Sequence, residues 1–188
     1  EGLRAELARM RGQDEQFTRE LGQSARELSE VQRRLNTQMQ AFDERLRVLE
    51  PQKVNVEGRE FVAAAVEKKE FDAGLAIFRT GDFAGAQVAF VDFAKRHPQS
   101  GYYPSALFWL GNAQYATRDY KEAIANFRAM LTQMPDHPRA AEAMLSIANC
   151  QIELKDMRAA RRSLEDVVRL HPKSEAAQAA RERLLKLR

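Results

Sequence analysis

The sequence contains few of the residues that interrupt helices or staple small folds. Its 188 residues include one cysteine, nine glycines and six prolines. A single cysteine excludes an intramolecular disulfide framework, and the apolar helical pattern around Cys150 indicates a small buried side chain rather than a nucleophile. Few glycines and prolines, with 44% hydrophobic and 30% charged residues, favour an all-α protein with much solvated surface.

Long apolar runs and a strong charge of one sign are also missing. No apolar run approaches the roughly 20 residues of a membrane-spanning helix. The formal net charge of +3 does not indicate nucleic-acid binding, which depends on a concentrated basic face. We interpret the small basic group of Arg158, Arg161 and Arg162 as a solvated helix face. Because the chain begins with Glu1 rather than Met, we expect a mature or truncated product, so a missing signal peptide does not argue against export.

Catalytic and metal-binding motifs are not found in the sequence. There is no Gly-rich phosphate loop, nucleophile elbow or zinc-protease helix. His97, His137 and His171 each precede a proline and are far apart in the chain, which predicts turn residues rather than metal ligands. Glu122 and Glu142 are interpreted as helix-surface charge. We therefore expect no catalytic residue, no metal and no cofactor, and a protein that is not an enzyme.

Residues 1–50 contain no proline and predict one long helix. As far as Leu35 its apolar residues recur at alternating steps of three and four, the a and d places of a heptad, with Asp14 and Ser24 in two of these places. The two consecutive steps of four from Val31 to Met39 form a stutter. Because a lone helix cannot bury so narrow a stripe, the segment is predicted to oligomerise. The mixed side chains leave two or three strands open. The predicted oligomer core is Leu7, Met10, Phe17, Leu21, Leu28, Val31, Leu35, Met39, Phe42, Leu46 and Leu49.

The next segment is predicted to be a linker over residues 51–66. Pro51 ends the long helix, because proline is not accommodated in a helix interior. The stretch PQKVNVEG, residues 51–58, reads as a short irregular connector. The helical pattern resumes within residues 59–74.

From residue 67 onward the sequence repeats with a pitch of 37 residues. Within each unit, an Asp is predicted to cap the second helix, small residues allow the helix pair to approach closely, a large apolar residue fills the groove between pairs, and a Pro ends the unit. The matching columns are Gly74, Gly111 and Ala148; Asp82, Asp119 and Asp156; Phe83, Tyr120 and Met157; Ala86, Ala123 and Ala160; Phe90, Phe127 and Leu164; and Pro98, Pro135 and Pro172.

This arrangement is the tetratricopeptide pattern of helix–turn–helix units, which are normally 34 residues long. Three extra residues per unit are placed between the second helix and the next unit. Stacked units need a polar lid at the end. The predicted fold is therefore a three-repeat solenoid over residues 67–188. Its repeats are expected over 67–101, 104–138 and 141–172, with a capping helix over 174–188.

The first helices of such units line a concave side, where extended peptides dock. Asn112 and Asn149 are predicted to bind the backbone of an extended partner, because an amide side chain both donates and accepts. Phe108 and Tyr115 would add apolar contact. Phe78 and Ile152 fit the core equally well. The predicted partner-binding groove is Phe71, Leu75, Phe78, Phe108, Asn112, Tyr115, Leu145, Asn149 and Ile152.

Two phrases resemble one family closely. They are HPQSGYYPSALFWLGNAQYATRDYKEAIANF, residues 97–127, and HPKSEAAQAARERL, residues 171–184. Together with the N-terminal heptads they resemble the periplasmic Tol–Pal-associated cell division coordinators of Gram-negative bacteria, the YbgF or CpoB family. Members typically show Tyr-Pro-x-Ser, then Tyr-Trp-Leu-Gly, Asp-Tyr and Ala-Ile at these offsets. His97 and His171 depart from the family's usual Tyr before Pro, and MPDHP, residues 134–138, lacks the Ser.

The resemblance implies a specific function. The N-terminal helix would be a trimerisation coiled coil, making the protein a homotrimer, and the expected localisation is the periplasm. The partners implied are TolA, which is anchored in the inner membrane, and a bifunctional penicillin-binding protein. Through them the protein would coordinate outer-membrane constriction with septal peptidoglycan synthesis during cell division.

Two other functions remain open from the residues themselves. One is a general tetratricopeptide adaptor outside the Tol–Pal system, located in the cytoplasm, that reads the C-terminal peptide of a client. Lysine and arginine clusters in the groove would favour that reading, whereas the predicted groove is mostly apolar with asparagines. The other is a fragment of a lytic or hydrolytic enzyme, which a neighbouring catalytic domain in a longer sequence would reveal.

Overall fold

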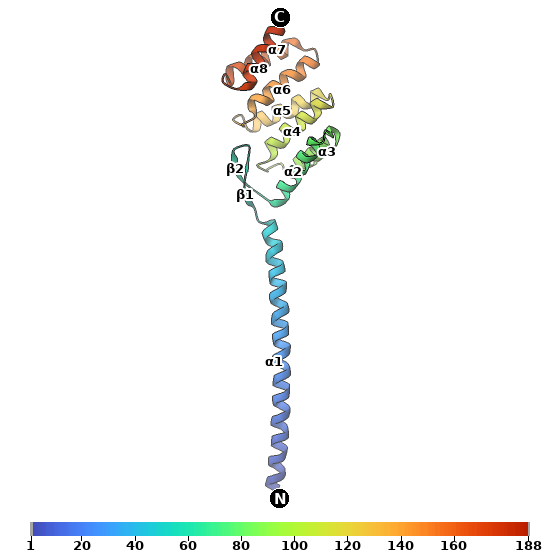
Figure 1. Ribbon diagram of the computed structural model, residues 1–188, viewed down its shortest axis with the longest axis vertical. Coiled ribbons are helices and arrows are strands. Elements are labelled where there is room, and N and C mark those ends of the chain that lie inside the picture. Colours follow the sequence, from blue (N-terminus) through green and yellow to red (C-terminus); the bar gives the residue numbers. More distant parts are fainter. Residues whose placement is uncertain (1, 188) are drawn as a thin grey trace. The chain divides into compact units, whose positions relative to one another are not determined.

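The computed structural model describes residues 2–187, without the side chains of residues 4, 5, 7, 8 and 47–49. The chain divides into two compact units, Glu1–Glu50 and Pro51–Arg188. Figure 1 shows their elements coloured along the chain. Over the described residues there are eight helices and one two-stranded sheet. The predicted all-α solenoid is thus confirmed, with a small hairpin added.

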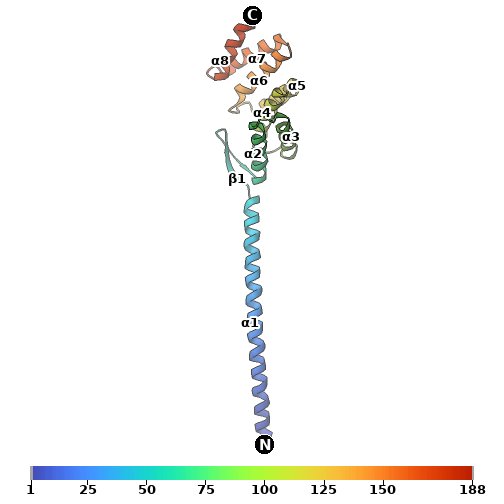
Figure 2. The ribbon, with the colours of Figure 1, turned by 45° about the vertical axis from the view of Figure 1, so that its right-hand side comes forward.

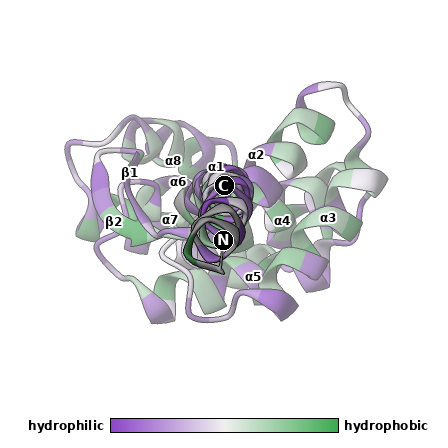
Figure 3. Ribbon diagram, turned by 90° about the horizontal axis from the view of Figure 1, so that it is seen from below, coloured by the Kyte–Doolittle hydropathy of each residue, from purple (hydrophilic) through white to green (hydrophobic). Residues whose placement is uncertain are grey.

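The first unit is a single helix, α1 (Gly2–Leu49). Ion pairs one turn apart, such as Arg34 Nη2 with Glu30 Oε1 at 2.6 Å, support its polar faces. Figure 3 shows α1 end-on, with hydrophilic residues over much of its surface. Nine members of the predicted apolar stripe, from Met10 to Leu46, are each 53–71% exposed. The side chains of the other two, Leu7 and Leu49, lie outside the described residues. Taken by itself, α1 therefore leaves a stripe of large apolar side chains in water.

The second unit begins with a β-hairpin, which corrects the irregular connector expected over residues 51–58 of the predicted linker 51–66. Strands β1 (Gln52–Val56) and β2 (Arg59–Ala63) pair antiparallel. Their side chains alternate between an exposed face and a half-buried face. This period of two is the signature of a half-buried strand, but each run is short and partly polar.

A two-residue turn joins the strands between the paired residues Val56 and Arg59. Glu57 and Gly58 have φ of 54° and 82°, as a type I′ turn requires at both central positions. The side-chain oxygen of Asn55 accepts a hydrogen bond from the Gly58 N–H at 3.2 Å. Glycine tolerates this conformation without strain, whereas Glu57 holds it against its own preference.

The inner face of the hairpin belongs to the core of the solenoid. Val54, Val56 and Phe61 pack against the first buried cluster, and Ala63 is a member of it. The ring of Phe61 occupies the space where a side chain at residue 101 would lie, so the glycine there is required by the contact. The hairpin is thus an integral part of the second unit.

Seven helices follow the hairpin and stack as antiparallel pairs with a final lid (Figures 1 and 2). The second helices of the three pairs begin 37 residues apart, as the sequence predicts. The extra residues lie in loops 97–102 and 134–139, between repeats. The helices are α2 (Ala65–Arg79), α3 (Phe83–Arg96), α4 (Tyr103–Ala116), α5 (Tyr120–Gln133), α6 (Ala140–Glu153), α7 (Met157–Leu170) and α8 (Glu175–Lys186).

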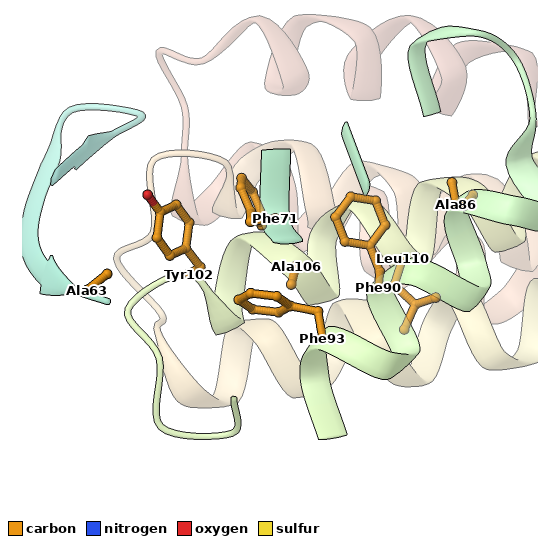
Figure 4. Close-up of a cluster of buried hydrophobic side chains, with 9 residues drawn as sticks. Ala63, Phe71, Ala86, Phe90, Phe93, Tyr102, Ala106 and Leu110 are labelled. Atoms are coloured by element: carbon orange, nitrogen blue, oxygen red, sulfur yellow. The ribbon is translucent and has the colours of Figure 1, made fainter. Parts of the chain in front are cut away.

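Three clusters of buried residues follow one another along the solenoid. In the first, Phe71 of α2 packs edge-on against Phe90 and Phe93 of α3, with ring centroids 6.0 and 5.9 Å apart. Figure 4 shows these rings together with Tyr102. Cys150 is fully buried in the second cluster, and burial raises the pKa of its thiol to about 12. The thiol therefore stays protonated and fills space, as its sequence context predicts.

Small residues set the distance between the helices of each pair. A side chain at Gly111 would place its Cβ 2.8 Å from ring carbons of Phe127, and one at Gly74 would lie 2.9 Å from Phe90. In the third repeat, Leu164 replaces the phenylalanine and lies in one buried cluster with Ala148. The predicted close approach is confirmed at Gly74 and Gly111. In the third repeat both positions change, to Ala148 and Leu164.

The second helices begin at the predicted aspartates. The carboxylates of Asp82 and Asp156 accept hydrogen bonds from the N–H groups of Gly85 and Ala159, at 2.8 and 3.0 Å. Asp119 also stands at the N-cap but makes no side-chain capping bond. The residue before each aspartate has a positive φ, namely Gly81, Arg118 and Lys155. The predicted cap is therefore right in two repeats and wrong in the middle one.

The paired columns give a direct test. Gly111→Ala should destabilise the solenoid by about 1–3 kcal/mol, because the added methyl group overlaps the Phe127 ring. Combining it with Phe127→Leu, which copies the Ala148–Leu164 pair, should cost clearly less than the sum of the two single changes. Urea unfolding followed through the fluorescence of Trp109, the chain's one tryptophan, measures both. Strict additivity would contradict the contact.

Candidate protein-binding groove

The first helices of the repeats form one continuous row. Helix α2 contacts α4, α4 contacts α6, and α6 contacts the lid α8. Helix α4 begins at Tyr103 and α6 begins 37 residues later, at Ala140. Residues 37 apart in the sequence therefore lie at corresponding places on these two helices. The structure therefore brings the nine predicted groove residues onto three neighbouring helices.

Two of the predicted groove residues are core residues instead. Phe71 is 2% exposed and Phe108 is 3% exposed. Phe71 fills the space beside Tyr102, with ring centroids 4.8 Å apart. Phe108 packs against Trp109 and Phe127. Neither ring presents enough surface for a partner, so their assignment as contact residues is corrected.

Five apolar groove residues remain half-buried: Leu75, Phe78, Tyr115, Leu145 and Ile152. The ring of Phe78 is held at 5.1 Å from that of Trp109. Desolvation by burial raises the pKa of the Tyr115 hydroxyl, so it stays neutral. These side chains are fixed by packing on one side and reach solvent on the other, which is the geometry of an apolar contact surface.

The two asparagines differ in the hydrogen bonds that they already make. The Asn112 side-chain amide donates to the Phe108 carbonyl of its own helix at 2.8 Å. Among the described residues, Asn149 makes no side-chain hydrogen bond that meets ordinary geometry. Both are half-buried. Asn112 therefore keeps its carbonyl oxygen as the main group to offer, whereas Asn149 offers both donor and acceptor.

A polar cluster missed by the sequence interpretation fastens the hairpin to the row. The Glu57 carboxylate at the hairpin turn forms an ion pair with Arg139 Nε at the start of α6. It also accepts from Ser105 Oγ of α4 at 3.3 Å and lies 3.6 Å from His137 Nε2. One charged side chain thus joins the hairpin to two successive repeats.

Arg139 is held on several sides. Its guanidinium carbon lies 5.1 Å from the centroid of Phe108 and 5.2 Å from that of Trp109. A second nitrogen pairs with Glu142 at 2.8 Å. Cation–π contact and the two carboxylates offset the cost of placing a cation beside a helix N-terminus. The sequence offered no spacing that pointed to this cluster, because Glu57 and Arg139 are far apart in the chain. Only the polar and charged residue types could have indicated it.

His137 is buried at the centre of the cluster, so its interpretation as a simple turn residue is incomplete. Its Nδ1 accepts the Arg139 backbone N–H at 3.1 Å. Nε2 therefore carries the proton and donates to Ser105 Oγ at 3.1 Å, while the hydroxyl donates to Glu57. Burial lowers the pKa of His137, and the neighbouring Arg59 and Arg139 act in the same direction against the opposing effect of Glu57 and Asp136.

The cluster contains serine, histidine and a carboxylate, the residue types of a hydrolase triad, but the hydrogen bonds between them follow a different pattern. In a triad the carboxylate orients the far nitrogen of the imidazole. Here a backbone N–H occupies Nδ1 of His137. Ser105 is 2% exposed, beneath the hairpin. The arrangement fastens two elements together.

The buried imidazole predicts a pH-dependent stability. Because its folded pKa is lowered, the unfolded chain binds more protons as the pH falls below about 6.5, and the stabilisation from neutral His137 is lost in that range. Unfolding followed by Trp109 fluorescence should show stability falling on acidification. His137→Asn keeps an acceptor for the Arg139 N–H and should flatten this slope. His171→Asn, after α7, controls for loss of a histidine, and an equal effect of both changes would contradict the assignment.

Among residues 2–187, no helix is both long and apolar enough to cross a bilayer. The same residues contain no group of three or more His, Cys, Asp or Glu side chains placed to hold a metal ion.

Comparisons with known proteins identify the fold. Two family models, both described as tetratricopeptide repeat, match residues 71–138 and 115–184. The chain has no significant sequence match among curated proteins.

Several solved structures share the fold. The second such domain of human RPAP3, solved with the HSP70 peptide SGPTIEEVD, is 18% identical, with 63% of this chain and 91% of that one covered at a TM-score of 0.53. PcrH from Pseudomonas aeruginosa is 15% identical, with 68% and 92% covered at a TM-score of 0.54. SycD of Yersinia enterocolitica, solved with a peptide of the translocator YopD, is 13% identical, with 66% and 91% covered at a TM-score of 0.56. We conclude that residues 71–184 are tetratricopeptide repeats, as the 37-residue pattern of the sequence predicts.

Proposed function

We propose that this protein is an oligomeric scaffold that binds extended segments of partner proteins along α2, α4 and α6. The observation that carries the proposal is the row of half-buried apolar and amide side chains on successive first helices, with Leu75, Tyr115 and Asn149 among them. Half-buried side chains are already fixed by packing on one side, so a partner can contact their exposed side at little cost in conformational entropy. The peptides bound by the RPAP3 and SycD domains support this use of the fold.

We further propose that the scaffold acts in the periplasm, in the Tol–Pal system. The support is the resemblance of residues 97–127 and 171–184 to the cell division coordinators, combined with an N-terminal apolar heptad stripe. The partners would be TolA and a bifunctional penicillin-binding protein. Binding both would let the scaffold coordinate outer-membrane constriction with septal peptidoglycan synthesis.

Helix α1 is proposed to form a parallel homotrimer. Its stripe is exposed over nearly its whole length, and burying apolar side chains of this size contributes about 1.5–3 kcal/mol each. This exposure supports self-association, and the strand number is taken from the family resemblance. Because the stripe runs along nearly the whole of α1, the trimer would have a long apolar interface.

The oligomer is tested on the full chain by sedimentation equilibrium. The parent should have three times the chain mass of 21.4 kDa. Leu21→Glu with Leu28→Glu should give monomers, because buried carboxylates would lack partners. Their solenoid should unfold like that of the parent when monitored by Trp109. The matched control Gln16→Glu with Gln23→Glu adds the same charge outside the stripe and should stay trimeric. A parent that sediments as monomer or dimer contradicts the trimer.

The groove is tested by calorimetry with purified TolA. Asn112→Ala with Asn149→Ala should weaken binding about tenfold or more, or about 1.4 kcal/mol, with little change in the unfolding curve or the oligomeric state. The control Arg158→Ala with Arg162→Ala changes the exposed face of α7 and should bind as the parent does. Undiminished binding by the asparagine variant would place the TolA contact outside the groove.

A further inference from the structure

A trough runs between strand β1 and the first turns of α2. Its volume is about 510 Å³, within the range of protein ligand sites. One wall is the whole of β1 and the turn residue Glu57, and the other is one face of α2 with Lys68, Phe71 and Leu75. A second hollow of about 320 Å³ adjoins it and shares Lys68 with it. Figure 4 shows Tyr102 between Ala63 at the end of the hairpin and Phe71 of α2.

The wall formed by β1 is an open sheet edge. In this hairpin the pair next to the two-residue turn, Val56 with Arg59, exchanges backbone hydrogen bonds, and bonded pairs alternate with non-bonded ones. Lys53 and Asn55 therefore belong to non-bonded pairs, and their N–H and C=O groups point away from β2. Among the described residues, β2 is the sole strand paired with β1. The free groups of β1 thus face the trough.

Strand β1 lacks the strongest blocks to another strand, a proline or a bulge. Natural sheet edges are commonly blocked by a proline, a bulge or a covering element. Residues 52–56 contain no proline, and their register with β2 is continuous. Lys53 is the one charged side chain of the strand. Because the opposite wall lies across an open trough, there is room for a third strand.

The charge around the trough selects the occupant. Lys53 and Lys68 line the trough, Lys69 lines the adjoining hollow, and Asp72 pairs with Lys68 at 2.7 Å. Glu57 is already engaged by Arg139. The unpaired charges that remain, Lys53 and Lys69, are positive, whereas the floor is apolar through the half-buried Val54 and Leu75. An extended segment with acidic and apolar residues in alternation matches both features.

We infer that β1 and α2 receive an extended acidic segment of another protein, which adds to β1 as a third strand. Backbone hydrogen bonds to Lys53 and Asn55 supply the register, and the alternate side chains contact the lysines and the apolar floor. The inference rests on the proposed protein-binding function and adds to it a second mode of recognition. A second copy of the chain fits less well, since its β1 strand, QKVNV, has no acidic side chain to place beside the lysines.

The first experiment measures amide hydrogen exchange in the full chain. Lysine, asparagine and valine are labelled with a nitrogen isotope, and the probe is acetyl-Glu-Val-Glu-Val-Glu-Val-Glu-amide. Saturating probe should slow exchange at Lys53 and Asn55 at least tenfold. Val62 should be unaffected, because its N–H points outward from the opposite edge, on β2. The matched probe acetyl-Lys-Val-Lys-Val-Lys-Val-Lys-amide should protect neither residue. Equal protection at Val62, or none at Lys53 and Asn55, overturns the inference.

The second experiment removes the donor at the edge. Lys53→Pro deletes one outward N–H and should weaken binding of the acidic probe at least tenfold, while Lys53→Ala should lose less, because it removes only the charge. Val62→Pro is the matched control, since Val62 lies directly opposite Lys53, and it should bind as the parent does. Equal losses in both proline variants overturn the inference.

Two further outcomes separate this inference from its rivals. Protection of Lys53 that rises with protein concentration in the absence of probe would assign the edge to a second copy and overturn the inference. If the probe leaves Lys53 unprotected while the Asn112 and Asn149 variant still loses TolA, the strand site is wrong and the proposed function stands. If the probe protects Lys53 but TolA binds every variant equally, the strand site stands and the groove assignment fails.

Discussion

Phe90 and Phe127 occupy the space that a side chain at Gly74 or Gly111 would need, and this contact sets the spacing of each helix pair. Because the second helix lies so close, its small residues Ala86 and Ala123 are fully buried. The paired helices then expose one face of the first helix, and successive pairs align these faces in a row. The candidate groove is a consequence of that row, so its geometry depends on the small and large columns far more than on any single groove residue.

The extra residues of each repeat have a second consequence. They lengthen the loops between repeats, and these loops supply Gly101, Tyr102, His137 and Arg139, which hold the hairpin. Phe61 contacts the first loop, and Glu57 contacts the second. The hairpin therefore binds across successive repeats and presents β1 beside α2. A repeat of ordinary length would have shorter loops and would lack part of this attachment. The 37-residue pitch therefore provides contacts that hold the hairpin.

The candidate groove and the hairpin edge offer a partner different chemical groups. Side chains on α2, α4 and α6 provide apolar area and amide groups, which select by shape and by hydrogen bonding. The edge of β1 provides backbone groups, which accept many sequences, and the nearby lysines then select for acidic ones. The exposed stripe of α1 supports the proposed self-association, and several copies of a weak site in one oligomer would raise the overall affinity through effective concentration.

The repetition of small, large, Asp and Pro columns in the sequence was enough to determine the solenoid, because each column has a local role in capping or close packing. The long proline-free helix was determined in the same way. Only the tertiary structure decided that residues 52–63 form a hairpin. Its short strands are stabilised by the ring contact of Phe61 with Tyr102 and by the ion pair of Glu57 with Arg139, rather than by their own alternation of apolar and polar residues. It also decided which groove residues are accessible. Phe71 and Leu145 occupy equivalent places in the periodic pattern, but neighbouring rings bury Phe71 whereas Leu145 stays half-buried. Burial depends on contacts between residues distant in the sequence.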